Sequence, residues 1–175
     1  MARMIDRMSG PVDNRPVPAA DLAETKIIDF SHPDIQATLT QLQAESASSE
    51  DLVRDIFEHG RDEVRRSMDH GDEVVTFIAS DVLREKTGLC YAKSHLAAAL
   101  YRAAGIPAGL AYQLLPTATK PVLHGLVAIN HRGHWQRPPR PAGSPHRPLT
   151  DTRWVSQPTT AGPPPAGDGQ NPLAR

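Results

Sequence analysis

The stretch TGLCYAKSHLAAALYRAAGIP, residues 87–107, decides the fold of this chain. Its apolar residues recur at the spacing of one helical face, at Ala92, Leu96, Ala99, Leu100 and Ala103. Gly105 ends the helix because glycine readily adopts the left-handed conformation that follows a helix, and Pro107 prevents a restart. The pattern predicts a largely buried helix whose first turn contains Cys90.

Three more helices are predicted upstream of this one. Residues 31–44 form the first, with Pro33 in its first turn, where the missing proline N–H costs nothing. Residues 49–67 form the second, which is capped by Ser49. A short helix over residues 80–85 leads into the cysteine helix.

Antiparallel strands are expected mainly after the helices. They are predicted over residues 26–30, 107–115, 122–129 and 134–137. Pro138 and Pro139 lack the backbone N–H that a strand ladder requires, so the sheet should be truncated at its C-terminal end. N-terminal helices followed by an antiparallel sheet indicate an α+β fold.

Composition divides the chain into three parts. Ten of the 17 prolines fall in residues 136–175, which hold only three residues of the Leu, Ile, Val and Phe set. We therefore predict a flexible segment over residues 1–21, a folded domain over residues 22–137 and a Pro-rich, disordered tail over residues 138–175. Residues 1–135 carry 14 basic and 18 acidic residues, a net charge of −4.

The overall composition excludes several classes of protein. With 19 basic and 20 acidic residues, the chain is not expected to bind nucleic acid or an anionic membrane. Its longest purely apolar stretch, residues 96–101, is far shorter than the roughly 20 residues of a membrane span, and no secretory signal is expected. One cysteine permits no internal disulfide, so a cytoplasmic protein is expected. The oligomeric state stays open.

Cys90 and His124 are the candidate catalytic residues. At the start of a helix, unpaired backbone N–H groups and the helix dipole favour a thiolate, and the same groups stabilise an oxyanion. His124 lies within a predicted strand, and a strand packed beside the cysteine helix would bring the imidazole within reach as a base. The alternative for both residues is structural, an inert buried thiol and a core histidine.

Two weaker signals involve histidine and basic residues. His131 and His134 form an H-x-x-H pair in a predicted turn, which would bind a metal only with further ligands and is otherwise a solvated turn. Lys93 and Arg84 are candidates to attract a carboxylate-bearing substrate, and the alternative is ordinary surface charge.

Residues 87–109 resemble the core of the transglutaminase-like superfamily, most closely its bacterial branch, in which a G-x-C helix ends in a GIPA turn. The LHGL segment at residues 123–126 resembles the histidine strand of that family, and GHW at residues 133–135 resembles the following G-x-W strand. The resemblance extends over residues 22–137.

The resemblance implies a papain-like α+β fold with a Cys-His-Asp triad. It also implies no redox cofactor and, in this branch, no metal. Carried over to this chain, Cys90 is the nucleophile and His124 is the base. The implied activity is thioester acyl transfer or hydrolysis on a peptide or amide substrate.

The third member of the triad is missing from its expected place. The family has an aspartate four residues after the strand tryptophan, where this chain has Pro139. No Asp or Glu occurs between Trp135 and Thr150, and Asp151 is the first candidate. In the best-studied triad, loss of the orienting carboxylate costs about 10⁴ in turnover.

This departure supports an alternative reading of the chain, as a catalytically inactive pseudoenzyme or a frameshifted or truncated family member with at most a peptide-binding role. Family-like sequence stops at Arg137. The residues that follow have the composition that translation of GC-rich DNA in a shifted reading frame would produce. Translation of the other two frames tests this hypothesis, which fails if neither gives an aspartate strand after the Trp135 codon. A sheet truncated in this way would also expose a strand edge and promote self-association.

Overall fold

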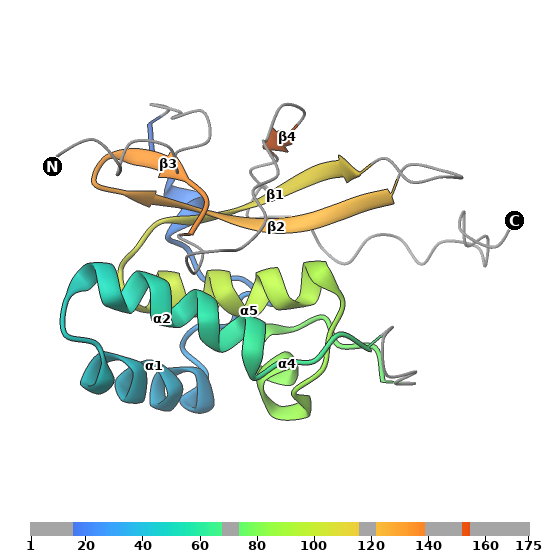
Figure 1. The fold of residues 1–175 in the computed structure, drawn as a ribbon, viewed down its shortest axis with the longest axis horizontal. Coiled ribbons are helices and arrows are strands. Elements are labelled where there is room, and N and C mark those ends of the chain that lie inside the picture. Colours follow the sequence, from blue (N-terminus) through green and yellow to red (C-terminus); the bar gives the residue numbers. More distant parts are fainter. Residues whose placement is uncertain (1–15, 68–73, 116–121, 139–151, 155–175) are drawn as a thin grey trace, which may run out of the picture.

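The computed structural model describes residues 16–67, 74–115, 122–138 and 152–154. A short 3-10 helix, η1 (Ala19–Asp21), precedes helices α1 (Pro33–Glu45), α2 (Ser49–Asp62), α4 (Ala79–Glu85) and α5 (Cys90–Ala103). Strands β1 (Ala108–Leu115), β2 (Val122–His131), β3 (His134–Gln136) and β4 (Thr152–Trp154) form one antiparallel sheet in the order β3-β2-β1-β4. The helices lie on one side of the sheet, with α2 and α5 nearest to it (Figure 1). The predicted α+β fold is confirmed.

Helix α5 is the centre of the domain, since it contacts the other α-helices and both long strands. Leu96, Ala98 and Leu100 are completely buried. The small alanine side chains let neighbouring elements approach closely. Tyr101 is also completely buried, and its hydroxyl donates a 2.7 Å hydrogen bond to the backbone oxygen of Val53 in α2. None of the described helices is long and apolar enough to cross a membrane.

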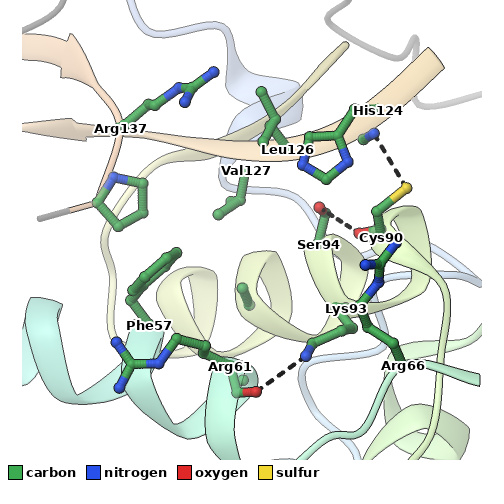
Figure 2. Close-up of a pocket in the computed structure, with 14 residues that line it drawn as sticks. Phe57, Arg61, Arg66, Cys90, Lys93, Ser94, His124, Leu126, Val127 and Arg137 are labelled. Atoms are coloured by element: carbon green, nitrogen blue, oxygen red, sulfur yellow. Dashed lines mark hydrogen bonds between the residues drawn. The ribbon is translucent and has the colours of Figure 1, made fainter. Parts of the chain in front are cut away.

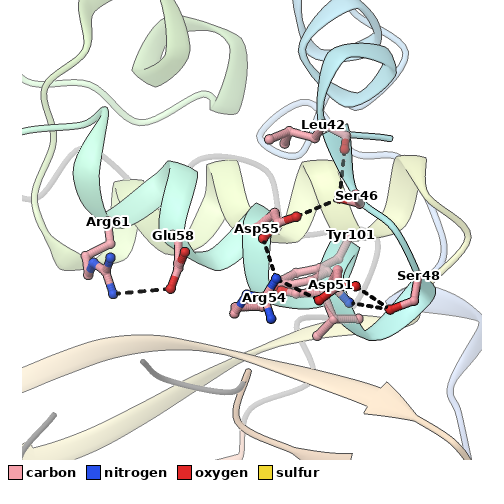
Figure 3. A network of polar contacts seen from close by, with 10 residues as sticks. Leu42, Ser46, Ser48, Asp51, Arg54, Asp55, Glu58, Arg61 and Tyr101 are labelled. Carbon is pink, nitrogen blue, oxygen red and sulfur yellow. Dashed lines mark hydrogen bonds and ion pairs between the residues drawn. The ribbon is translucent and has the colours of Figure 1, made fainter. Parts of the chain in front are cut away.

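Polar contacts fix the connection between α1 and α2 (Figure 3). The Ser48 hydroxyl accepts a 3.1 Å hydrogen bond from the Asp51 amide, so the cap of α2 is one residue before the predicted Ser49. Ser46 Oγ lies 2.7 Å from Asp55 Oδ2 and ties the connection to the second turn of α2. The two helices are thereby held in an antiparallel pair under the sheet.

A buried ion pair joins the N-terminal segment to helix α5. Asp21 and Arg102 are 3% and 7% exposed, and their charged groups lie 3.8 Å apart. The Arg102 guanidinium also donates to the backbone oxygens of Ala108 and Ala23. The packed unit therefore includes Asp21, one residue before the domain boundary predicted from composition.

The tail contributes one strand to the sheet. Residues 152–154 pair with residues 111–113 of β1, whereas composition predicted disorder for the tail from residue 138 onward. The outer edge of β1 offers backbone groups that β2 does not use, and a short segment can pair there whatever its composition. Apart from Pro138, the rest of the tail and residues 1–15 lie outside the described residues. Strand β3 ends at Gln136, as the proline pair predicts.

Helix α2 contains a glycine that alanine can replace. A Cβ added to Gly60 would meet no atom within 4 Å, and glycine costs a helix interior about 0.5–1 kcal/mol relative to alanine. We expect Gly60→Ala to raise the free energy of unfolding by about that amount in a urea titration. Gly105→Ala should lower it by roughly 1–2 kcal/mol, because φ is +74° there. A Gly60→Ala variant less stable than the native chain would contradict this packing.

Candidate active site

Cys90 is the first residue of α5, and the chain before it is tightly packed. A Cβ on Gly88 would lie 3.0 Å from the Ala92 Cβ and 3.1 Å from Thr76 Oγ1, so a side chain there would force its neighbours to shift. The N-cap residue, Leu89, offers no side-chain cap, and the first turn holds no acidic residue. The dipole of α5 therefore acts on the thiol without a neutralising carboxylate in that turn.

The backbone of β2 reaches the sulfur atom. The Gly125 amide donates to Cys90 Sγ at 3.4 Å. Gly125 pairs with Tyr112 of β1, whereas β3 pairs only with residues 129–131, so the other edge of β2 is open to the cysteine at this point. A Cβ on Gly125 would lie 2.9 Å from the Tyr91 Cα, a distance no side chain tolerates. Glycine thus lets β2 approach the start of α5.

The residue before this glycine, His124, borders the same pocket as Cys90. The pocket has a volume of about 210 Å³ and lies between α2, α5 and β2. Figure 2 shows the imidazole of His124 and the thiol of Cys90 at the same end of it. The structure therefore brings together the two residues that the sequence singled out.

Within the described residues, no aspartate or glutamate lines this pocket. Gln113 of β1 lies directly opposite His124 in the strand register and is 8% exposed. Its Oε1 accepts a 2.9 Å hydrogen bond from Arg137 Nη2, at the residue that follows β3. Sequence reasoning missed Gln113 and Arg137, and only the strand register would have revealed Gln113. Asp151 lies outside the described residues.

Among the other residues that the sequence singled out, Lys93 lines the pocket, whereas His131, His134 and Arg84 do not. His131 and His134 pair across the β2–β3 turn, and His131 Nε2 lies 3.8 Å from a carboxylate oxygen of Glu50. No group of three or more His, Cys, Asp or Glu residues in the described ranges is arranged to hold a metal ion. Lys93 lines the pocket, whereas Arg84 does not and pairs instead with an aspartate of its own helix at 2.6 Å.

Aromatic rings support the turn that carries Cys90. The ring centroid of Phe77 lies 5.7 Å from that of Tyr91 and 4.9 Å from that of His95. His95 Nδ1 donates to the backbone oxygen of Phe77 at 2.8 Å, which places its proton on Nδ1, and burial lowers the pKa of His95. Burial, with the charge of Cys90 as a second cause, raises the pKa of Tyr91 and of Tyr112.

Fold and site together define a class, an α+β domain of the papain type with a cysteine at a helix start and a histidine on a neighbouring strand. The model of the transglutaminase-like superfamily matches residues 36–138, and the chain belongs to that superfamily. The crystal structure of a proposed cysteine protease from Cytophaga hutchinsonii has a similar fold, with a TM-score of 0.55 and 20% sequence identity. The match covers 66% of this chain but 38% of that one, so this chain matches well under half of that protein. No curated protein matches the sequence.

The close approach at Gly125 can be tested by substitution. Gly125→Ala should push β2 away from α5, because the new Cβ would overlap the backbone of Tyr91. We expect a loss of about 1–3 kcal/mol in unfolding free energy. The rate at which iodoacetamide alkylates Cys90 should change as well. Gly60→Ala, in the same pocket but with open space around its Cβ, is the matched control. Equal stability of the Gly125→Ala and native proteins would refute the close approach.

The buried His95 predicts a loss of stability in acid. Because its folded-state pKa is lowered, the unfolded chain takes up a proton first as the pH falls below about 6.5, and unfolding is favoured. Urea titrations should show the free energy of unfolding falling between about pH 7.5 and pH 5. His95→Asn removes the titrating group and should lose less over that range. An identical pH dependence in the variant would contradict a neutral, buried His95.

Proposed function

We propose that this domain is a cysteine enzyme that acts on amide or peptide carbonyls through a thioester, with Cys90 as nucleophile and His124 as base. The observation that carries the proposal is the shared pocket: Cys90 and His124 lie at the same end of it, and the Gly125 amide donates to the sulfur.

The reaction follows from these positions. His124 takes the proton from Cys90, and the sulfur bonds to the carbonyl carbon of the substrate. Backbone N–H groups at the start of α5 stabilise the oxyanion. The carbon–nitrogen bond then breaks, and the amine leaves with the proton from His124. Water or a second amine attacks the thioester, gives a proton to His124 and releases the acid or new amide, and that proton returns to the sulfur.

Gln113 is the group we expect to orient His124. It lies opposite the histidine in the register of β1 and β2, and opposed residues on paired strands bring their side chains close together. An amide oxygen can accept a hydrogen bond from an imidazole N–H, but it carries no charge to stabilise imidazolium. We therefore expect the reaction to be slower than it would be with a carboxylate as the third member of the triad.

A second candidate function, binding of peptides without catalysis, is favoured by one observation. No acidic side chain among the described residues lines the pocket, so none there would stabilise a protonated His124. In this reading Cys90 is an ordinary thiol in a groove that still admits a peptide. Thiol reactivity separates the two candidates.

The test is the rate of alkylation of the single cysteine by iodoacetamide near pH 6, where a free thiol reacts slowly. The native protein should react at least about tenfold faster than His124→Ala, because the base is lost. Gln113→Leu should fall between them. His134→Ala, at an exposed histidine outside the pocket, is the matched control, and circular dichroism checks folding. Equal rates in the native and His124→Ala proteins would leave only the binding function.

A further inference from the structure

Exposed apolar side chains gather in two short segments of the chain. Of the eight large hydrophobic residues that are exposed in the described ranges, six belong to these segments, namely Val74, Val75, Phe77, Ile78, Val122 and Leu123. Single exposed hydrophobic residues are ordinary on a protein surface, whereas a contiguous group of them marks a site of interaction. Two segments so far apart in the sequence form such a group only where the fold brings them together.

Leu123 is exposed although it lies on the core face of its strand. Side chains alternate along a strand, so Leu123 shares one face of β2 with Gly125, Val127 and Ile129. Val127 and Ile129 are buried in the core, whereas the side chain of Leu123 is 59% exposed. Helix α5 begins beside Gly125, and the start of β2 extends beyond it (Figure 1). The face that forms the core further along β2 is therefore open to solvent at Leu123.

The other segment is attached to the chain just before Cys90. The hydroxyl of Thr76 donates a 2.7 Å hydrogen bond to the backbone oxygen of Thr87, and both threonines are buried. The neighbours of Thr76 in sequence, Val75 and Phe77, are 77% and 39% exposed. The segment thus presents Val75 and Phe77 to solvent, and Thr76 anchors it three residues before the nucleophile.

Tyr91 joins the two segments. Its ring centroid lies 5.7 Å from that of Phe77, and a Cβ on Gly125 would lie 2.9 Å from its Cα. Residues two apart on a strand are separated by about 7 Å, so Leu123 lies about that far from the point where β2 meets Tyr91. The four residues Val75, Phe77, Tyr91 and Leu123 are called the apolar surface below.

Cys90 lies between the apolar surface and the pocket. The α5 residues that line the pocket share one face of the helix: Cys90, Lys93, Ser94 and Ala97. Tyr91 is the next residue along the helix, so its side chain leaves α5 on a different side, toward Phe77. None of the four residues of the apolar surface lines the pocket. A peptide that extends in both directions from a carbonyl at the sulfur therefore meets the pocket on one side and the apolar surface on the other.

We propose that the apolar surface binds a large apolar side chain of the peptide substrate, next to the reacting carbonyl, with Leu123 and Phe77 as the specificity-determining residues. The occupant is the substrate because the surface is continuous with the candidate active site through Tyr91, the neighbour of Cys90. Removal of a leucine-sized side chain from water strengthens binding by about tenfold. The proposal rests on the proposed function only in taking Cys90 as the reacting group.

Alkylating agents that differ in one group test the proposal. N-isobutyl iodoacetamide carries the side chain of leucine on its amide, and iodoacetamide carries hydrogen there. In both cases the sulfur bonds to the methylene carbon and iodide leaves. Because the full-length chain has one cysteine, every modification reports on Cys90. The ratio of the N-isobutyl rate to the iodoacetamide rate should be at least about fivefold higher in the native protein than in the urea-unfolded chain.

A polar reagent and surface variants assign this effect. N-(2,3-dihydroxypropyl) iodoacetamide has a similar size but a polar group, and it should show no such rise. Leu123→Ser should lower the N-isobutyl ratio about three- to fivefold. Leu22→Ser is the matched control, at a leucine that is 42% exposed and lines neither the pocket nor the apolar surface, and it should leave the ratio unchanged.

Phe77→Ser should act like Leu123→Ser. It also removes the ring contact with His95, so Leu123→Ser, at an exposed side chain, carries the test if the Phe77 variant fails to fold. A high ratio that persists in Leu123→Ser would place the isobutyl group elsewhere and overturn the proposal.

Capped dipeptides identify the side of the reacting bond that the apolar side chain occupies. N-acetyl-leucyl-serine amide carries leucine on the acyl side, N-acetyl-seryl-leucine amide carries it on the amine side, and N-acetyl-seryl-serine amide has no large apolar group. One of the first two should protect Cys90 from iodoacetamide better than the third, and the better protector identifies the side. Equal protection by all three would overturn the proposal.

A second copy of this chain is the other occupant that an exposed apolar surface could take. Sedimentation velocity at the protein concentration of the alkylation experiments separates the two occupants. A monomer supports the binding of substrate. A dimer that dissociates in Leu123→Ser would show that the apolar surface joins two copies, and it would overturn the proposal.

The outcomes also separate this inference from the proposed function. A fast reaction with iodoacetamide that depends on His124, with a rate ratio equal to that of the unfolded chain, would overturn apolar selection and leave the enzyme proposal intact. A raised ratio that falls in Leu123→Ser, with an iodoacetamide rate that ignores His124, would support the apolar surface and contradict catalysis.

Discussion

One close approach of backbone to backbone organises the site. Strand β2 lies so near the start of α5 at Gly125 that a Cβ there would be 2.9 Å from the Tyr91 Cα. The approach lets the Gly125 amide reach Cys90 Sγ, and it brings the neighbouring His124 to the same pocket. The approach in turn requires α5 to be held in place, and the tight packing of its buried residues, Ala92 and residues 94–102, does so.

Local patterns were sufficient to predict the α-helices and the strands from residue 108 to residue 136. The helical spacing before Gly105 and Pro107 predicted α5 because both its core face and its stop signal lie within one short stretch. The strand predicted at residues 26–30 was wrong, since the structure has a turn there. Thr25 Oγ1 accepts hydrogen bonds from two nearby amides and holds that turn, a polar contact that outweighs the β propensity of the segment.

The site was only partly predictable, because its parts come from separate elements. Cys90 and His124 were found through their local settings and a family resemblance. Gln113 and Arg66 carry no local signal, since their relation to the site depends on the register of β1 with β2 and on the packing of the chain after α2. The pairing of residues 152–154 with β1 could not be predicted from the sequence either, because an open strand edge exists only once the sheet has assembled.

The central claim is that the sulfur of Cys90 lies against the open edge of β2, and hydrogen exchange of the Gly125 amide measures it most directly. A net hydrogen bond of about 0.5–1.5 kcal/mol predicts that this amide exchanges roughly two- to tenfold faster in Cys90→Ala than in the native protein. The amide of Ala128, which is farther along β2 and opposite Gly109, should not change. An unchanged exchange rate at Gly125 would show that the sulfur is not bonded there and would contradict the account of the site.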